Sequence, residues 1–203
     1  MEPVDDAQAG ACCVESKVQV IPPLETQRLV LRPLTLQDAD QIQERFPDWE
    51  VVRFMAAAIP WPYPPDGALT WCRDVALPQM ACGDAWHWTI RLKDEPDQVI
   101  GVISLMRTED NNRGFWIGVK WQGQGLATEA AEAATDFWFD VLKFSVLRVP
   151  KAAANLASRR VSEKLNMRVI ATEQRDHVCG RAVDETWEIT ADEWHSRSRL
   201  RKT

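Results

Sequence analysis

The sequence is poor in the residues that mark several large classes of protein. Its five cysteines are odd in number and include no C-x-x-C pair; they are Cys12, Cys13, Cys72, Cys82 and Cys179. This argues against a disulfide framework and favours free thiols in a reducing cytoplasm. The three histidines, His87, His177 and His195, stand far apart, without the spacing of metal ligands. We therefore expect a cytoplasmic protein with no metal site.

Long hydrophobic runs and an excess of basic charge are also lacking. No apolar stretch approaches the roughly 18–20 residues that a membrane helix needs, and the acidic start of the chain does not fit a secretory signal. The formal charge of −6 at pH 7 argues against broad nucleic-acid binding. The motifs G-x-S-x-G, H-E-x-x-H and G-K-[ST] are absent, so hydrolase, metalloprotease and P-loop interpretations lack support. An anionic ligand held by backbone amides remains compatible with these absences.

Aromatic residues are present in an unusual set, with ten tryptophans and the single tyrosine Tyr63. Tyr63 lies in the proline-rich run 59–67, which predicts an irregular but ordered loop. This loop either serves packing alone or lines the mouth of a substrate site. The tryptophans suggest core filling and an aromatic acceptor mouth, without further assignment.

The chain of 203 residues fits one domain with a substantial core. Residues 1–22 lack periodicity and are predicted to be a flexible tail, residues 23–195 a single domain, and residues 196–203 a basic C-terminal tail. Hydrophobic periodicity predicts strands at 28–34, 85–92, 98–107, 114–121, 146–150, 168–173 and 186–190. It predicts helices at 36–46, 66–80, 126–143 and 155–165. This order predicts a mixed α/β sheet flanked by helices.

The segment 117–129 carries the strongest chemical signal. An apolar strand ends there, a loop with Gly123 and Gly125 follows, and a long helix begins at once. Glycines let a ligand approach the main chain closely, and the first turn of a helix presents unpaired N–H groups with partial positive charge. The combination predicts a phosphate or pyrophosphate site that needs no Lys or Arg. Taken alone, the glycines favour a simple tight strand-to-helix turn over an anion site.

Three ordered motifs resemble those of the GNAT N-acetyltransferase superfamily. Gln122-x-x-Gly125-x-Ala127 is similar to its (Arg/Gln)-x-x-Gly-x-(Gly/Ala) pyrophosphate loop. The run 155–167, NLASRRVSEKLNM, is similar to the second signature, N-x-x-S-x-R-V-x-E-K-L-G-(F/M), with Asn166 in place of the Gly. The run 24–34, LETQRLVLRPL, resembles the start of the RimJ/RimL branch of ribosomal-protein N-acetyltransferases. The resemblance covers roughly residues 24–194.

The resemblance implies the GNAT fold, which is an α/β (α+β) fold with a mixed, mostly antiparallel sheet of six to seven strands and about four flanking helices. It also implies acetyl-CoA as cosubstrate, with the pantetheine arm between two splayed central strands, at 114–120 and 146–151 in this chain. Several residues would then contact the cofactor through main-chain or side-chain groups. They are Ile117, Val119, Gln122, Gly123, Gln124, Gly125, Leu126, Ala127, Thr128, Asn155, Ser158 and Arg160.

Asn155 and Ser158 are the catalytic candidates that the resemblance implies. Family members place this helix start near the cofactor sulfur, so Ser158 would protonate the leaving thiolate, and the Val119 N–H would polarise the carbonyl. Helix capping is the alternative role, because Asn155 is an excellent N-cap. Lys164 and Arg160 either reach the CoA phosphates or are simply solvated.

The general base is not identified by the sequence. Many relatives carry a Glu where this chain has Asn112, and the nearby Glu109 and Asp110 are turn acids of the kind that is usually solvated. Asp184 occupies a place near the C-terminal strand where relatives often have an Asp, and a structural hydrogen bond is the favoured role for it. Deprotonation through water is the remaining alternative.

The leading hypothesis is an N-acetyltransferase that moves the acetyl group of acetyl-CoA to a primary amine by direct attack in a ternary complex. The acceptor would be a protein N-terminus or a small-molecule amine, and a homodimer is left open. Two alternatives remain at this point. One is a non-catalytic acyl-CoA-binding or sensing module, motivated by the missing Glu at position 112, and the other is a transferase that uses a different acyl-CoA donor.

Overall fold

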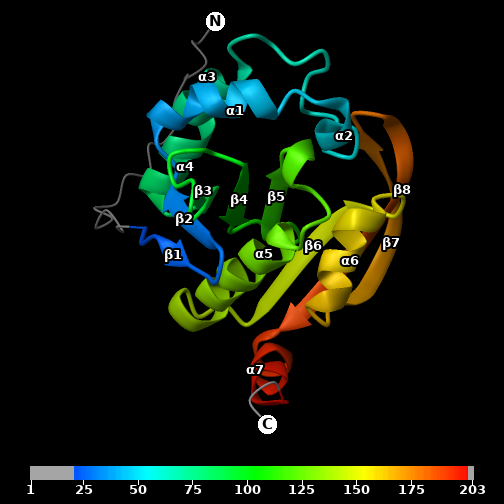
Figure 1. The fold of residues 1–203 in the computed structure, drawn as a ribbon. Helices are drawn as coiled ribbons and strands as arrows, with labels where there is room; N and C mark the ends of the chain where they lie inside the picture. Colours follow the sequence, from blue (N-terminus) through cyan, green and yellow to red (C-terminus); the bar gives the residue numbers. More distant parts are fainter. Residues whose placement is uncertain (1–20, 201–203) are drawn as a thin grey trace, which may run out of the picture.

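Eight β-strands form two sheets within residues 21–200, the part of the chain that the computed structural model describes (Figure 1). The first sheet has the order β1-β2-β3-β4-β5 and the second has the order β6-β8-β7, with antiparallel neighbours throughout. The strands are β1 (Leu24–Glu25), β2 (Leu29–Pro33), β3 (Ala85–Leu92), β4 (Gly101–Met106), β5 (Arg113–Ile117), β6 (Val146–Ala152), β7 (Arg168–His177) and β8 (Gly180–Thr190).

Seven α-helices accompany the sheets in this described range. They are α1 (Ala39–Arg45), α2 (Trp49–Val52), α3 (Gly67–Trp71), α4 (Leu77–Cys82), α5 (Leu126–Asp136), α6 (Leu156–Lys164) and α7 (Ala191–Leu200). A π-helical turn joins α3 to α4, so the helix predicted at 66–80 is a composite of three pieces. A second π-helical turn, Phe137–Val141, extends α5.

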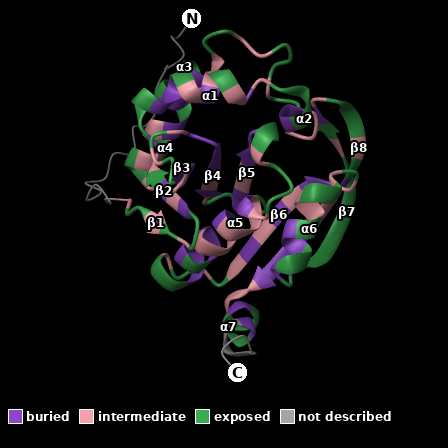
Figure 2. Ribbon diagram, viewed as in Figure 1, coloured by how far each residue is buried: buried purple, intermediate pink, exposed green. Residues whose placement is uncertain are grey.

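The mixed, mostly antiparallel α/β fold predicted from the sequence is confirmed, and all seven strands that periodicity indicated are present. The eighth, β1, has two residues and therefore no periodic signal. The β7–β8 hairpin extends well beyond the predicted ranges. Nearly every residue of β7 is exposed (Figure 2), so the strand lacks the alternation of buried and exposed residues by which a strand is recognised in a sequence.

β5 and β6 meet at one end only, and this separates the two sheets. The Asn112 N–H donates to the Arg148 carbonyl at 2.7 Å, and the Arg148 N–H donates to Asn112 Oδ1 at 2.7 Å. Beyond this point the two strands belong to different sheets. The splayed central strands that we expected are therefore present, with their apex at Asn112. A side-chain amide makes this junction, so Asn112 has a structural function at the position where relatives carry Glu.

Two hydrophobic cores lie on opposite sides of the first sheet. Helix α5 lies over one face of the first sheet, with α6 beside it in front of β6 and β7 (Figure 1), and both helices contribute to the core that contains Trp86, Trp88 and Trp138. Helices α1 and α3 enclose the second core, which contains Trp116. Burial of this apolar surface is the dominant favourable contribution to folding. Six of the ten tryptophans are buried, namely Trp86, Trp88, Trp116, Trp138, Trp187 and Trp194, which agrees with the predicted core-filling role.

Both predicted tails differ from expectation at their inner ends. The indole N–H of Trp88 donates to the Pro22 carbonyl at 2.9 Å, and Ile21 packs against the core. The remainder of the predicted N-terminal tail, residues 1–20, lies outside the described residues. Residues 196–200 continue α7, because Arg197 is buried and pairs with Glu132 at 2.9 Å; residues 201–203 again lie outside the description.

None of the helices among residues 21–200 combines the length and the apolar character that crossing a membrane requires.

Candidate functional site

The loop between β5 and α5 has the conformation that its glycines predict. β5 ends at Ile117, and a 3₁₀ turn at Val119–Trp121 follows. Gly123 and Gly125 both have left-handed backbone conformations, with φ of 75° and 81°. A Cβ costs roughly 1–2 kcal/mol in that conformation. The main chain of this loop is therefore open to close approach by a ligand.

The first turn of α5 presents free N–H groups to this loop. Gly125 is the N-cap, and the first helical hydrogen bond runs from the Glu129 N–H to the Gly125 carbonyl at 3.1 Å. The N–H groups of Leu126, Ala127 and Thr128 precede that bond, and the first N–H groups of a helix have no intrahelical partner. Together with the helix dipole they form a site suited to an anion.

Two glutamine side chains hold the loop in shape. Gln122 Nε2 donates to the Ile117 carbonyl at 2.9 Å, and Gln124 Nε2 donates to the Lys120 carbonyl at 3.1 Å. The main-chain N–H of Gln122 is engaged in the turn, where it donates to the Val119 carbonyl at 3.2 Å. The amides that point out of the turn therefore begin after Gln122, one residue later than expected.

Val119 lies in this 3₁₀ turn, whereas the sequence placed it in a strand that continued to residue 121. The strand ends early because the Gly118 N–H makes its last bond, to the Ile100 carbonyl at 2.9 Å, and the chain then turns away from β4. Val119 is 45% exposed. Val119 therefore lies in an exposed turn directly after β5 and before the glycine-containing loop.

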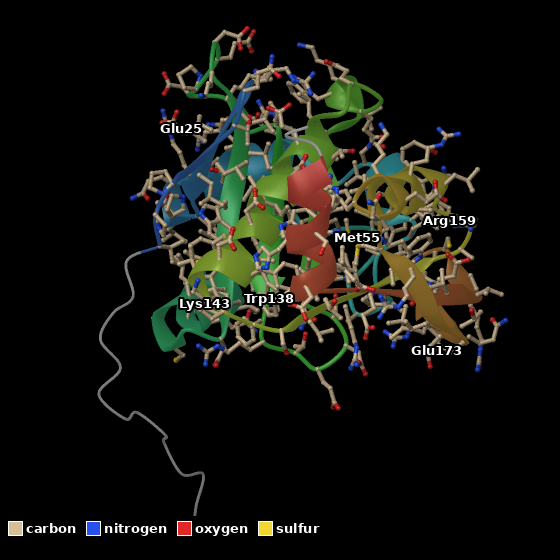
Figure 3. The ribbon with its side chains drawn as sticks, turned by 90° about the horizontal axis from the view of Figure 1, so that it is seen from below. Glu25, Met55, Trp138, Lys143, Arg159 and Glu173 are labelled. Carbon is tan, nitrogen blue, oxygen red and sulfur yellow. The ribbon has the colours of Figure 1, made fainter. Side chains whose placement is uncertain are left out.

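Asn155 and Ser158 lie at the start of α6, which follows β6 directly. Asn155 Oδ1 accepts the Ser158 N–H at 3.1 Å, so the predicted capping role of Asn155 is confirmed by its geometry. Ser158 is half-buried, and its hydroxyl takes no part in this cap. Arg160 is exposed. Its neighbour Arg159, labelled in Figure 3, pairs with Glu185 at 3.1 Å.

Lys151 is a buried amine whose place beside the site was not expected from the sequence. It lies on β6, donates to Ser162 Oγ beneath α6, and its Nζ is 5.5 Å from the ring centre of Trp187. Burial lowers the pKa of the Lys151 ammonium to about 7, and the Arg113 guanidinium adds to this shift. The sequence does contain a signal for this burial, because Lys151 is two residues after Val149 and four after Leu147, both of which are buried. That period of two places its side chain on the inner face of the strand.

The low pKa of Lys151 gives a test by stability. Between pH 7 and 10.5 the unfolded chain binds a proton that the folded chain releases, so this residue makes the free energy of unfolding rise with pH in that window. Lys151→Met should stabilise the protein at pH 7 by on the order of 1 kcal/mol and flatten that rise. Thermal unfolding from pH 6.5 to 10 measures both effects. The exposed Lys164→Met is the matched control, and equal pH profiles for wild type and Lys151→Met would contradict the assignment.

Two of the three acidic candidates for a general base, Asp110 and Asp184, lie beside basic side chains. Asp110 pairs with Arg148 at 2.9 Å in the turn before β5. Asp184 is almost fully buried on β8, with Oδ1 3.3 Å from Nε2 of His177 and Oδ2 3.6 Å from Nε of Arg175. Burial raises the pKa of the Asp184 carboxyl, and the neighbouring His177 and Arg175 oppose that shift. Glu109 is exposed and lines a cavity of about 300 Å³ beside Asn112.

Tyr63 and the proline-rich loop fold against α1. The Tyr63 ring meets Phe46 edge-on at 5.0 Å, and Phe46 meets Trp116 of β5 at 5.4 Å. Burial raises the pKa of the Tyr63 hydroxyl to about 12, with a smaller contribution from Cys72, which favours a packing role. Trp49, at the start of α2, and Trp61, in the proline-rich loop, form an exposed pair with ring centres 5.6 Å apart.

Comparison with known proteins gives concordant matches. A family model described as an acetyltransferase (GNAT) domain matches residues 28–168. The uncharacterized N-acetyltransferase p20 of Bacillus licheniformis is 28% identical over 150 residues, which are 70% of this chain and 80% of that protein.

Two solved structures illustrate the similarity of fold. The ribosomal-protein-S5-alanine acetyltransferase of Vibrio fischeri has a TM-score of 0.72 at 15% identity, over 86% of this chain and 99% of that one. RimJ of Mycobacterium smegmatis, in complex with a CoA-disulfide, has a TM-score of 0.71 at 18% identity, over 85% and 87% of the two chains. Both matches extend over most of the described residues and both show the same architecture.

Proposed function

The chain belongs to the GNAT acetyltransferase family, and from this premise we propose that it is a member of the RimJ/RimL-like branch and transfers the acetyl group of acetyl-CoA to a primary amine. The acceptor in this proposal is a protein N-terminus or a small-molecule amine. The transfer is by direct attack in a ternary complex.

The conformation of the β5–α5 loop is the observation that carries the proposal. A left-handed Gly125 precedes three helix N–H groups that have no intrahelical partner. This arrangement suits the diphosphate of CoA, because its negatively charged oxygens can accept hydrogen bonds from the N–H groups at the helix start. It requires no basic surface, so it agrees with a chain whose formal charge is −6.

The cofactor would be held by main-chain and side-chain groups along the splay. The diphosphate would lie against the amides of Gly123, Gln124, Gly125, Leu126, Ala127 and Thr128. The pantetheine arm would lie between β5 and β6 in the manner of an added strand, beside Ile117 and Val119. Gln122 would contribute by shaping the loop, and Arg160 lies on the exposed side of α6, where it would meet phosphate groups.

The chemistry needs a polarised carbonyl and a proton for the leaving thiol. Acetyl-CoA supplies an activated acetyl thioester. In the proposal the main-chain N–H of Val119 stabilises the charge that develops on the carbonyl oxygen. As the amine nitrogen bonds to the carbonyl carbon and the C–S bond breaks, the Ser158 hydroxyl would give its proton to the leaving sulfur and regain one, through water, from the amine nitrogen. Asn155 keeps Ser158 in place through the helix cap.

The names of structural neighbours support an amine on a protein as acceptor. One neighbour is an acetyltransferase for the alanine of ribosomal protein S5. The exposed Trp49–Trp61 pair is a candidate for the acceptor mouth of this chain, because amphipathic aromatic rings give large contact area at low entropic cost.

Thiol release from acetyl-CoA tests the proposal. The purified protein is mixed with acetyl-CoA and a panel of small amines and peptides with free N-termini, and free CoA is measured. Release that depends on the acceptor supports the proposal. Tight CoA binding without release on any acceptor would favour a sensing module, and release from succinyl-CoA in preference to acetyl-CoA would correct the donor.

A further inference from the structure

The turn between β1 and β2 is bonded to the first turn of α5, about a hundred residues later in the chain. The hydroxyl of Thr26 donates to Glu129 Oε1 at 2.5 Å, and the main-chain N–H of Arg28 donates to the same oxygen at 2.7 Å. Arg28 Nε and Nη2 both lie 2.7 Å from Glu129 Oε2. The carboxylate of Glu129 is therefore gripped by four donors from one short turn.

The same guanidinium also touches the glycine loop. Arg28 Nη1 donates to the main-chain carbonyl of Gln124 at 3.0 Å. Arg28 Nη2 lies 3.5 Å from the position that a Cβ on Gly125 would take. One planar group thus spans the residue before the N-cap, the N-cap itself and the first turn of the helix, which are the groups that hold the anion in the proposed function.

We call the set of contacts among Thr26, Arg28 and Glu129 the clamp. Its effect on an anion site follows from the charges of these residues. Glu129 brings a negative charge into the first turn of α5, where a bound diphosphate would also lie. Burial alone would raise the pKa of Glu129, but the Thr26 hydroxyl, the Arg28 N–H and the Arg28 guanidinium together lower it. The carboxylate is therefore ionised, and the cation that neutralises it is Arg28. Two guanidinium nitrogens meet the same oxygen, Glu129 Oε2, and charge-assisted contacts of this kind fix geometry as well as charge.

We propose that Arg28, with Thr26 and Glu129, is a positioning residue that holds the β5–α5 loop in its anion-binding conformation. This inference rests on the proposed function. It gives a physical role to the Thr-x-Arg of residues 26–28, which the acetyl-transfer chemistry itself does not use. The bonds of this clamp reach the main chain of the loop, so Arg28 acts on the cofactor through the loop amides.

Substitutions at the clamp test the inference, with CoA as the probe in calorimetry. Arg28→Gln removes both the positive charge and the planar fork of guanidinium donors, and should weaken CoA binding roughly tenfold. Arg28→Lys keeps the charge but lacks the planar fork, and should weaken binding nearly as much. Thr26→Val removes one donor with little change in shape and should give a smaller loss. Glu25→Gln is the control, because Glu25 lies on β1 of the same hairpin but points outward (Figure 3), where it pairs with Lys93 after β3 at 3.1 Å.

Amide hydrogen exchange in the absence of CoA supplies a readout of positioning. The N–H groups of Gln122 and Glu129, which are hydrogen-bonded on either side of the free loop amides, should exchange faster in Arg28→Gln than in wild type, while the strands of the first sheet keep their protection and the melting temperature confirms folding. Normal CoA affinity in Arg28→Lys would overturn the inference in favour of charge alone. Unchanged affinity and exchange in Arg28→Gln would overturn it outright. If the wild-type protein itself does not bind CoA, the proposed function fails.

Discussion

Gly125→Glu is expected to abolish CoA binding, with a loss of at least about 100-fold in affinity. Gly125 has φ of 81°, so any side chain there strains the backbone by roughly 1–2 kcal/mol. A glutamate also brings a carboxylate to the three free N–H groups at the start of α5. That carboxylate would accept the hydrogen bonds of these N–H groups in place of the diphosphate, and its negative charge would repel the diphosphate. Titration calorimetry with CoA measures the effect.

Two further glycine variants separate charge from strain. Gly125→Ala adds the strain without the charge and should lose far less affinity. Gly83 has φ of 73°, lies at the end of α4, and would meet nothing within 4 Å if it carried a Cβ. Gly83→Glu therefore repeats the strain and the charge away from the loop, and its affinity for CoA should match wild type. A wild-type affinity in Gly125→Glu would mean that the anion site lies elsewhere.

Ser158→Ala is expected to slow turnover about 100-fold while CoA affinity changes little. The hydroxyl is the proposed proton donor, whereas the cap of α6 uses the main-chain N–H of Ser158 with Asn155 Oδ1. Alanine keeps that N–H, so the helix start remains capped. The effect should therefore fall on kcat and leave both the binding of CoA and the melting temperature near their wild-type values.

Asn155→Ala is the structural counterpart of this variant. Loss of an N-cap side chain costs about 1 kcal/mol of stability, so its melting temperature should fall. Steady-state kinetics and thermal unfolding on both variants distinguish the roles. If Ser158→Ala has normal kcat, Ser158 is only a residue of the first helical turn. If Ser158→Ala loses activity only in proportion to lost stability, as Asn155→Ala would, the catalytic role is likewise excluded.

The loop and the helix starts were readable from the sequence because their signals are local. A glycine before a helix permits left-handed backbone conformations that strain most other residues, and Gly125 adopts such a conformation. Asn155 likewise caps the helix that follows it within three residues. The antiparallel α/β fold followed from periodicity and from the family motifs. The boundaries were less readable, as in β7, where exposure on both faces leaves no period to detect.

Contacts across the fold could not be read in the same way. Nothing near Asn112 indicates that its side chain bonds to the main chain of Arg148 and fixes the apex of the splay. The same is true of Asp110, whose partner Arg148 comes from another strand. These pairings depend on which strands end up adjacent, so they are properties of the tertiary structure.

The sequence by itself determined the family, the glycine loop and the helix that presents its free amides, since these depend on residues within one or two turns of each other. Only the tertiary structure decided that Arg28 and Thr26 clamp Glu129, that Lys151 is buried beneath α6, and that Tyr63 packs on α1. The physical reason is distance along the chain. A hydrogen bond or a low-dielectric environment depends on groups that are far apart in sequence, and folding alone brings them together.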